Sequence, residues 1–174
     1  MRQKPCQPKN FEEFWIDRVE NWLIKDVDTC IQNWANIGAT TLIFCYIDFF
    51  GSLVRPKANS RDRFCKFIEE YFSLINKKYD FYKCKLYEDF RCGLVHEAIM
   101  KKGTGIFRST DPADRGYKHL ETYNNALWID LIQLEIDFVK TANKLKKDIN
   151  TNSVFKQKAI TRLRDLKWDL PDEK

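Results

Sequence analysis

The chain has 174 residues, of which 44% are hydrophobic and 14% are aromatic. This length fits one domain with a substantial core, and this composition excludes disorder for most of the chain. The formal net charge of +5 is a mild basic excess, compatible with a polyanionic partner but no demonstration of one. We therefore expect a single domain over residues 1–174, with residues 1–10 as a loose lead-in.

Six cysteines occur, and none of them forms a Cys-x-x-Cys pair. The chain has only two histidines, and their spacing does not match a zinc finger, so we expect no metal site and no cofactor. Most of the cysteines fall at apolar positions of helical patterns, which fits the reducing cytosol. The first ten residues do not resemble a signal peptide. The longest apolar run, Thr40–Phe50, contains Asp48 and is too short to span a bilayer. We expect a cytoplasmic protein without a membrane partner.

Hydrophobic periodicity predicts helices over most of the chain. Apolar residues at steps of three and four predict an amphipathic helix from Phe11 to Trp34, with Asn10 as its N-cap. A helix that is apolar nearly all round is expected from about Ile37 to Leu53, in the middle of a bundle. A third helix is expected over about 61–78, with Ser60 as its N-cap, and a fourth over about 82–100.

The stretch from 101 to 117 holds three of the six glycines and predicts a loop of unusual length. Ile106-Phe107 and residues 119–122 are candidates for a short hairpin within this region.

A fifth helix is expected to start at Asn124 or Asn125 and to reach about Asp148. A last helix is expected from Asn152 or Ser153 to a point before Pro171. Together these elements predict an all-α bundle of five to six helices, with one long loop or short hairpin around 103–123.

The stretch Leu86–Glu97 is the most informative one, because it places Arg91 five residues before His96. Proton transfer near neutral pH is typical of histidine. The spacing alone is weak evidence, since ten arginines and two histidines produce such a pair by chance roughly one time in three. In an ideal α-helix a step of five residues separates two side chains by about 140°. The two would meet if Gly93 allowed a local distortion or if the long arginine side chain reached around the helix.

The motif Arg91-Cys-Gly-Leu-Val-His96-Glu97, in a helix of a helical protein, resembles the HEPN superfamily. Weaker support comes from Gly51–Pro56 and the helix after Ser60, which are similar to uncharacterised bacterial HEPN-like proteins. The resemblance covers roughly 36–140. It implies a metal-independent endoribonuclease in which the RNA 2′-hydroxyl attacks the adjacent phosphate and leaves a cyclic phosphate. His96 would transfer the proton and Arg91 would stabilise the charge on the phosphate.

The resemblance also implies a twofold homodimer whose cleft holds both motifs, with Phe90, Leu94 and Val95 as candidates for its apolar face. Such proteins often act as toxins or in antiphage defence, so an antitoxin or a defence-system protein is an expected partner. Many members have Asn, Asp or His directly after the arginine. The present chain has Cys92 there, and this difference favours the alternative of a non-catalytic HEPN-like module that binds nucleotide, RNA or protein and dimerises. A helical adaptor unrelated to the family is a third alternative.

Three further residues are candidates for supporting roles. Asp48 lies in an apolar helix, where a carboxylate needs a partner, and it either faces Arg91 or another basic residue or lies at the wet edge of the bundle. Cys92 is either a packed thiol or a reactive one beside positive charge. Glu97 is a candidate for orienting His96, or for an ion pair with Arg91, as is Glu88.

Basic residues gather in and around the long loop, and they are either a phosphate-binding rim or ordinary solvated side chains. The candidates for RNA binding are Lys101, Lys102 and Arg108, and Arg115 and Lys118 lie in the same region. His119 is expected to be structural or exposed rather than catalytic.

Overall fold

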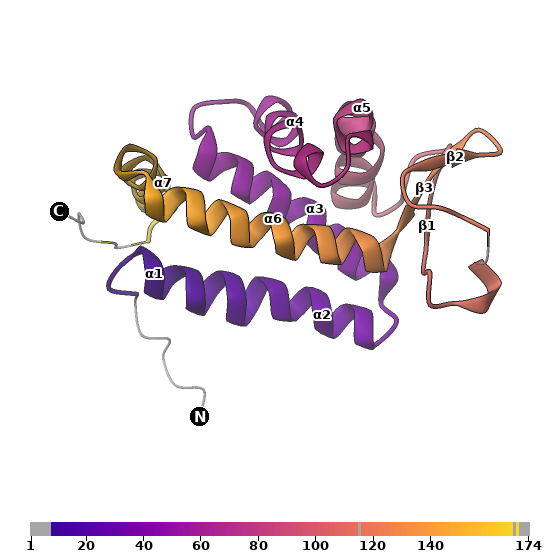
Figure 1. Ribbon diagram of the computed structural model, residues 1–174, viewed down its shortest axis with the longest axis horizontal. Helices are drawn as coiled ribbons and strands as arrows, with labels where there is room; N and C mark the ends of the chain where they lie inside the picture. Colours follow the sequence, from indigo (N-terminus) through magenta and orange to yellow (C-terminus); the bar gives the residue numbers. More distant parts are fainter. Residues whose placement is uncertain (1–7, 115, 169, 171–174) are drawn as a thin grey trace.

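The computed structural model describes residues 8–114, 116–168 and 170. Helices make up most of the chain, and a small three-stranded sheet lies at one end of them (Figure 1). The prediction of a predominantly helical protein is therefore confirmed, whereas the sheet was not part of the predicted all-α bundle. One hydrophobic core draws on the helices and the sheet, from Phe11 to Leu170.

The first helix is continuous but not uniform. It consists of α1 (Phe11–Phe14), the π-helical segment η1 (Trp15–Ile24) and α2 (Lys25–Gln32). Asn10 is its N-cap as predicted, because its side-chain oxygen accepts a hydrogen bond of 2.8 Å from the Glu13 N–H. Glu12 and Glu13 in its first turn also stabilise this end of the helix, because they place negative charge at the positive end of the helix dipole.

Helix α3 (Asn36–Val54) lies at the centre of the molecule, as its apolar composition predicts (Figure 1). It packs against α2, α4, α6 and α7. By length and composition alone it is the one helix among the described residues that could cross a membrane, and 56% of its apolar window is buried inside the protein. That burial is what the core helix of a globular domain shows.

The chain then forms α4 (Ser60–Glu70), the 3₁₀ turn η2 (Phe72–Leu74) and α5 (Lys78–Lys85). Two π-helical segments follow α5, η3 (Leu86–Arg91) and η4 (Gly93–Glu97). The predicted third helix is therefore shorter than expected, and its N-cap is Asn59, whose side chain accepts from the Asp62 N–H. This leaves the Ser60 hydroxyl free for another contact.

The sheet contains β1 (Thr104–Phe107), β2 (Glu121–Tyr123) and β3 (Ala126–Asp130) in the order β1-β3-β2, with the 3₁₀ turn η5 (Pro112–Asp114) between β1 and β2. β1 runs parallel to β3, and β2 runs antiparallel to β3. The predicted pairing of 106–107 with 119–122 is therefore wrong, because β3 lies between these two segments.

The hairpin instead joins β2 to β3 through Asn124 and Asn125, whose φ angles are 50° and 62°. Two-residue hairpins favour positive φ at both loop positions, and asparagine tolerates it. The prediction that either asparagine starts the fifth helix is wrong. That helix, α6 (Leu131–Thr151), starts after Asp130, whose side chain accepts from the Ile132 N–H. The last helix is α7 (Ser153–Asp165), with Asn152 as its N-cap.

Candidate functional site

Arg91 and His96 lie in the π-helical end of the α5 segment. Hydrogen bonds from residue i to i+5 widen the turn, so that residues five apart follow one another on the same face. An α-helix would separate these two side chains by about 140°. The local distortion near Gly93, one of the sequence-based explanations, is therefore what the structure contains.

The two side chains are in direct contact. The distance from Arg91 Nη1 to His96 Nε2 is 2.8 Å. A guanidinium can only donate, so Nε2 is the acceptor and carries no proton in this arrangement. His96 is exposed, and the Arg91 side chain is 15% exposed. The pair therefore lies at the surface of a single chain, with His96 exposed and the Arg91 side chain mostly buried.

Asp48 of α3 binds the Arg91 guanidinium on its buried side. Its Oδ2 accepts 2.9 Å hydrogen bonds from Arg91 Nη2 and from the Ser60 hydroxyl, and its Oδ1 accepts one of 2.7 Å from Arg63 Nε. The Asp48 side chain is only 6% exposed. Of the two positions considered for Asp48, facing Arg91 is the one observed.

The charges around Asp48 decide its protonation state. Burial acts to raise the pKa of Asp48, but hydrogen bonds from Arg63 and Ser60 and the charges of Arg63 and Arg91 outweigh it and hold the pKa below its usual value. For Arg91, burial acts to lower the pKa, and Asp48 raises it above the ordinary value. Both groups are therefore ionised, and the guanidinium is held between a carboxylate and an imidazole.

Glycine at two positions allows the backbones to approach closely enough for this arrangement. A Cβ on Gly51 would lie 2.6 Å from the Arg63 carbonyl oxygen, so its absence lets α4 approach α3 beside Asp48. A Cβ on Gly93 would lie 2.6 Å from the Ile99 carbonyl oxygen. The chain after η4 therefore folds back against the motif.

That return is completed by Ala98, which has a left-handed φ of 57°, and by the Lys101 N–H, which donates to the Asp89 carbonyl. Lys101 thus follows directly on the motif, and both it and Lys102 are exposed. Their positions fit the predicted phosphate-binding rim, and their role stays a prediction.

Cys92 is a half-buried free cysteine next to Arg91 in the sequence. Glu97 is exposed and, within the described part of the chain, makes no hydrogen bond to His96. Glu88 pairs with Arg61 rather than with Arg91. Neither glutamate therefore holds the motif in the way considered from the sequence.

Arg108 lies away from the predicted rim. Its side chain is buried, and its Nη1 donates to the Ile31 carbonyl at 2.9 Å and to Asn36 Oδ1 at 3.0 Å. Its guanidinium stacks on the Trp34 ring. Arg108 thus joins the end of α2 to the start of α3, a placement that does not fit an exposed phosphate contact. Lys118 is exposed, and Arg115 lies outside the described residues.

His119 belongs to a buried polar network at the other end of α5. The Asp130 N–H donates to its Nδ1, so a neutral ring carries its proton on Nε2, which lies 2.9 Å from the Tyr79 hydroxyl. That hydroxyl donates to Asp137 on α6. Burial lowers the pKa of His119, although the charges of Asp137 and Asp130 oppose this. The expectation of a structural rather than catalytic residue matches this position.

Sequence reasoning missed Arg63 and Ser60 as members of the Asp48 cluster. The available signal was the run Ser60-Arg-Asp-Arg63 directly after the helix that contains a lone carboxylate. A buried carboxylate is stabilised by all of its cationic partners together, so naming Arg91 alone describes only part of the Asp48 cluster. Among the residues described, no group of three or more His, Cys, Asp or Glu side chains is placed to hold a metal ion.

Comparison with known proteins found no match: no protein-family model, no curated protein and no solved structure is similar to this chain. The HEPN resemblance therefore rests on the sequence motif and stays a prediction.

Proposed function

We propose that this protein is a metal-independent endoribonuclease of HEPN type, with Arg91 and His96 as its catalytic residues. The observation that supports the proposal is the 2.8 Å contact between Arg91 Nη1 and His96 Nε2 at the surface of a π-helical segment. A π-helical turn inside an α-helix is rare, and such turns are frequently found at functional sites.

The chemistry requires a base and a group that stabilises negative charge. His96 Nε2 is unprotonated and is therefore able to accept the proton of an RNA 2′-hydroxyl. The oxygen then attacks the adjacent phosphorus and the bond to the 5′-oxygen breaks. That oxygen takes up a proton from water, and His96 releases to water the proton that it accepted. The products are a 2′,3′-cyclic phosphate and a 5′-hydroxyl.

Arg91 would change partners when RNA binds. Its Nη1 donor now occupies the His96 lone pair, and a phosphate oxygen would draw that donor away and free Nε2. Asp48 keeps hold of Nη2 during the exchange, so the guanidinium pivots rather than leaves. In this account Asp48 is a positioning residue, and Arg63 and Ser60 hold it in place.

The proposed homodimer would place two such pairs in one cleft. Phe90 and Leu94 are buried in the core of the single chain, so they are not available as an apolar dimer face. Val95 and Ile99 are exposed, and they flank His96 in sequence. We propose these two residues as the apolar part of the interface. A toxin or defence role, with a protein partner, stays a prediction from the resemblance.

The test is cleavage of mixed RNAs in excess EDTA by the wild type and by Arg91→Ala and His96→Ala variants. Arg61→Ala is the matched control, because Arg61 is a nearby exposed arginine paired with Glu88. The proposal predicts cleavage by the wild type and by Arg61→Ala, and none by the two motif variants. Equal cleavage by all four proteins would mean a contaminating nuclease and would contradict it.

A second candidate function is a non-catalytic RNA-binding module. It is favoured by the burial of Arg91, whose Nε has no hydrogen-bond partner and whose Nη donors are already engaged by Asp48 and His96. This alternative predicts that RNA is retained intact in a filter-binding assay. It also predicts that Arg91→Ala retains as much RNA as Arg61→Ala, because the Nη donors of Arg91 are already engaged.

A further inference from the structure

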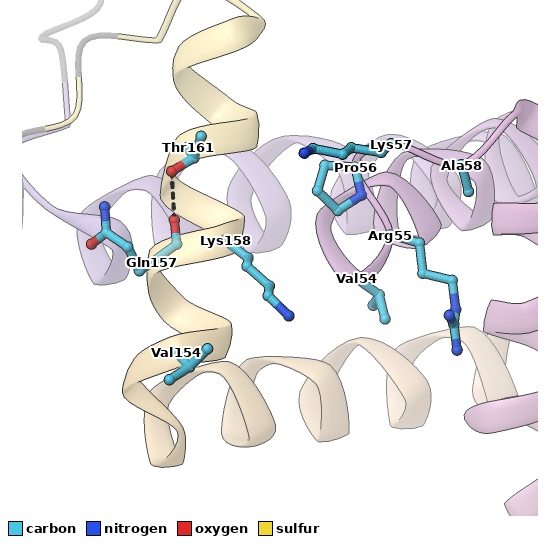
Figure 2. A pocket seen from close by; sticks show the side chains of 9 residues that line it. All are labelled: Val54, Arg55, Pro56, Lys57, Ala58, Val154, Gln157, Lys158 and Thr161. Carbon is cyan, nitrogen blue, oxygen red and sulfur yellow. Dashed lines mark hydrogen bonds between the residues drawn. The ribbon is translucent and has the colours of Figure 1, made fainter.

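A hollow lies away from Arg91 and His96, between the end of α3 and helix α7. Its volume is about 810 Å³. That is within the range of small-molecule sites, roughly 300–1,000 Å³. Figure 2 shows its two walls, with Val54, Arg55 and Pro56 on one side and Val154 and Lys158 of α7 on the other. A smaller hollow of about 310 Å³ shares Val54, Val154 and Lys158 with it.

The lining combines apolar surface with positive charge. Val54, Pro56, Ala58 and Val154 supply the apolar part, and Val154 is 65% exposed although it is a large aliphatic residue. Among the residues that the structure describes, the charged ones of the lining are all cations, Arg55, Lys57 and Lys158, and none is a carboxylate.

Neither lysine of the lining has an acidic partner among the described residues. Arg55 is paired with Glu70, but Lys57 and Lys158 form no ion pair with any residue that the structure describes. In Figure 2 the Lys158 side chain extends from α7 toward the gap, and Lys57 lies above it beside Pro56. Two unpaired ammonium groups at the rim of an apolar hollow attract an anion whose remaining body is apolar.

We propose that this hollow binds a small amphipathic anion, with an aliphatic or aromatic body against Val54 and Val154 and a carboxylate, sulfonate or phosphate beside Lys57 and Lys158. The apolar body contributes through the surface that it removes from water. The charge fixes its orientation and excludes cations of the same shape. The site is independent of the proposed ribonuclease activity, because none of the motif residues lines it.

The probe is 8-anilinonaphthalene-1-sulfonate, whose fluorescence rises when its apolar rings leave water. The wild type is titrated beside Lys57→Glu/Lys158→Glu and beside a matched control, Lys25→Glu/Lys140→Glu, which makes the same change of charge at exposed lysines that do not line the hollow. We expect the dissociation constant to rise about tenfold or more in the first variant, equivalent to at least one lost charge interaction, and to stay unchanged in the control. Circular dichroism checks that both variants are folded.

Competition experiments then test whether binding requires both the negative charge and the apolar body of the ligand. Octanoate is expected to displace the probe, whereas inorganic phosphate or 1-octanol at the same concentration is not. Equal binding by both charge variants, or displacement by octanol as effective as by octanoate, would overturn the proposal. Loss of probe binding on Trp22→Ala instead would place the probe in the separate aromatic hollow around Arg18 and contradict it as well. Binding that disappears as protein concentration rises would show that a second copy of the chain occupies the hollow, which also contradicts it.

Discussion

Asp48 lies in the most apolar helix of the chain, where a carboxylate without partners would be strongly disfavoured. The two arginines and one serine around it come from two other segments, so the cluster also joins α3 to α4 and to η3. The sequence was sufficient to require a partner for Asp48 and to name Arg91 as a candidate. It was not sufficient to find Arg63, because helix phase alone does not show which face of α4 meets α3.

Replacing Asp48 by asparagine is predicted to destabilise the fold. The change leaves Arg63 and Arg91 partly buried beside each other without a counter-charge, and we expect a loss of about 3 kcal/mol in the free energy of unfolding. Urea denaturation measures it, with Glu88→Gln as a control that breaks only the exposed pair with Arg61. An Asp48→Asn protein as stable as that control would contradict the anchoring role.

His119 gives the protein a pH dependence that is distinct from any catalytic one. Because burial lowers the pKa of His119 in the folded state, the unfolded chain binds more protons below its ordinary value of about 6.5. The contribution of neutral His119 to the free energy of unfolding is therefore fully present above that pH. We predict that the free energy of unfolding falls as the pH drops below it.

The measurement is urea denaturation across this range for the wild type, His119→Gln and His96→Gln. The chain has only these two histidines, so each variant removes one of them. The slope should be lost in His119→Gln and kept in His96→Gln. A slope that follows His96 instead would show that the buried network was assigned wrongly.

At the scale of elements, the close contact of α3 and α4 depends on Gly51. We predict that Gly51→Ala destabilises the fold by about 2 kcal/mol, as overpacking a tight interface typically does, because the new Cβ would meet the backbone carbonyl of Arg63. Gly38→Ala is a matched control in the same helix, where the nearest atoms are 3.7 Å and 3.8 Å away. It should stabilise the protein slightly through helix propensity. Thermal denaturation of both variants checks the prediction, and equal effects would refute it.

Helix positions were predictable where apolar periodicity was long and caps were clear, as at Asn10 and Asn152. Strand β3 was missed because its short apolar run continues directly into the apolar stripe of α6, and periodicity does not separate the two. The Asn124-Asn125 pair was the available hairpin signal. The π-helical segments were not predictable, since the choice between i+4 and i+5 bonding depends on close contacts such as that of Gly93 with Ile99.

At the scale of the whole molecule, the proposed dimer is open to direct test. Val95→Asp/Ile99→Asp is predicted to convert a dimer to a monomer in sedimentation velocity, because it places charge in the apolar face that would be buried. Leu74→Asp is the control, since Leu74 is exposed to a similar degree, 63% against 64% for Ile99, and lies elsewhere on the chain. A wild type that is monomeric at all concentrations would rule out the dimer while leaving the Arg91–His96 contact within one chain.

The most direct test of the proposed ribonuclease activity is the chemistry of the ends that the wild type leaves on RNA in EDTA. We predict fragments with a 2′,3′-cyclic phosphate and a 5′-hydroxyl, formed by the wild type and absent with His96→Ala. Intact RNA, fragments with a 3′-hydroxyl, or identical fragments from His96→Ala would contradict it.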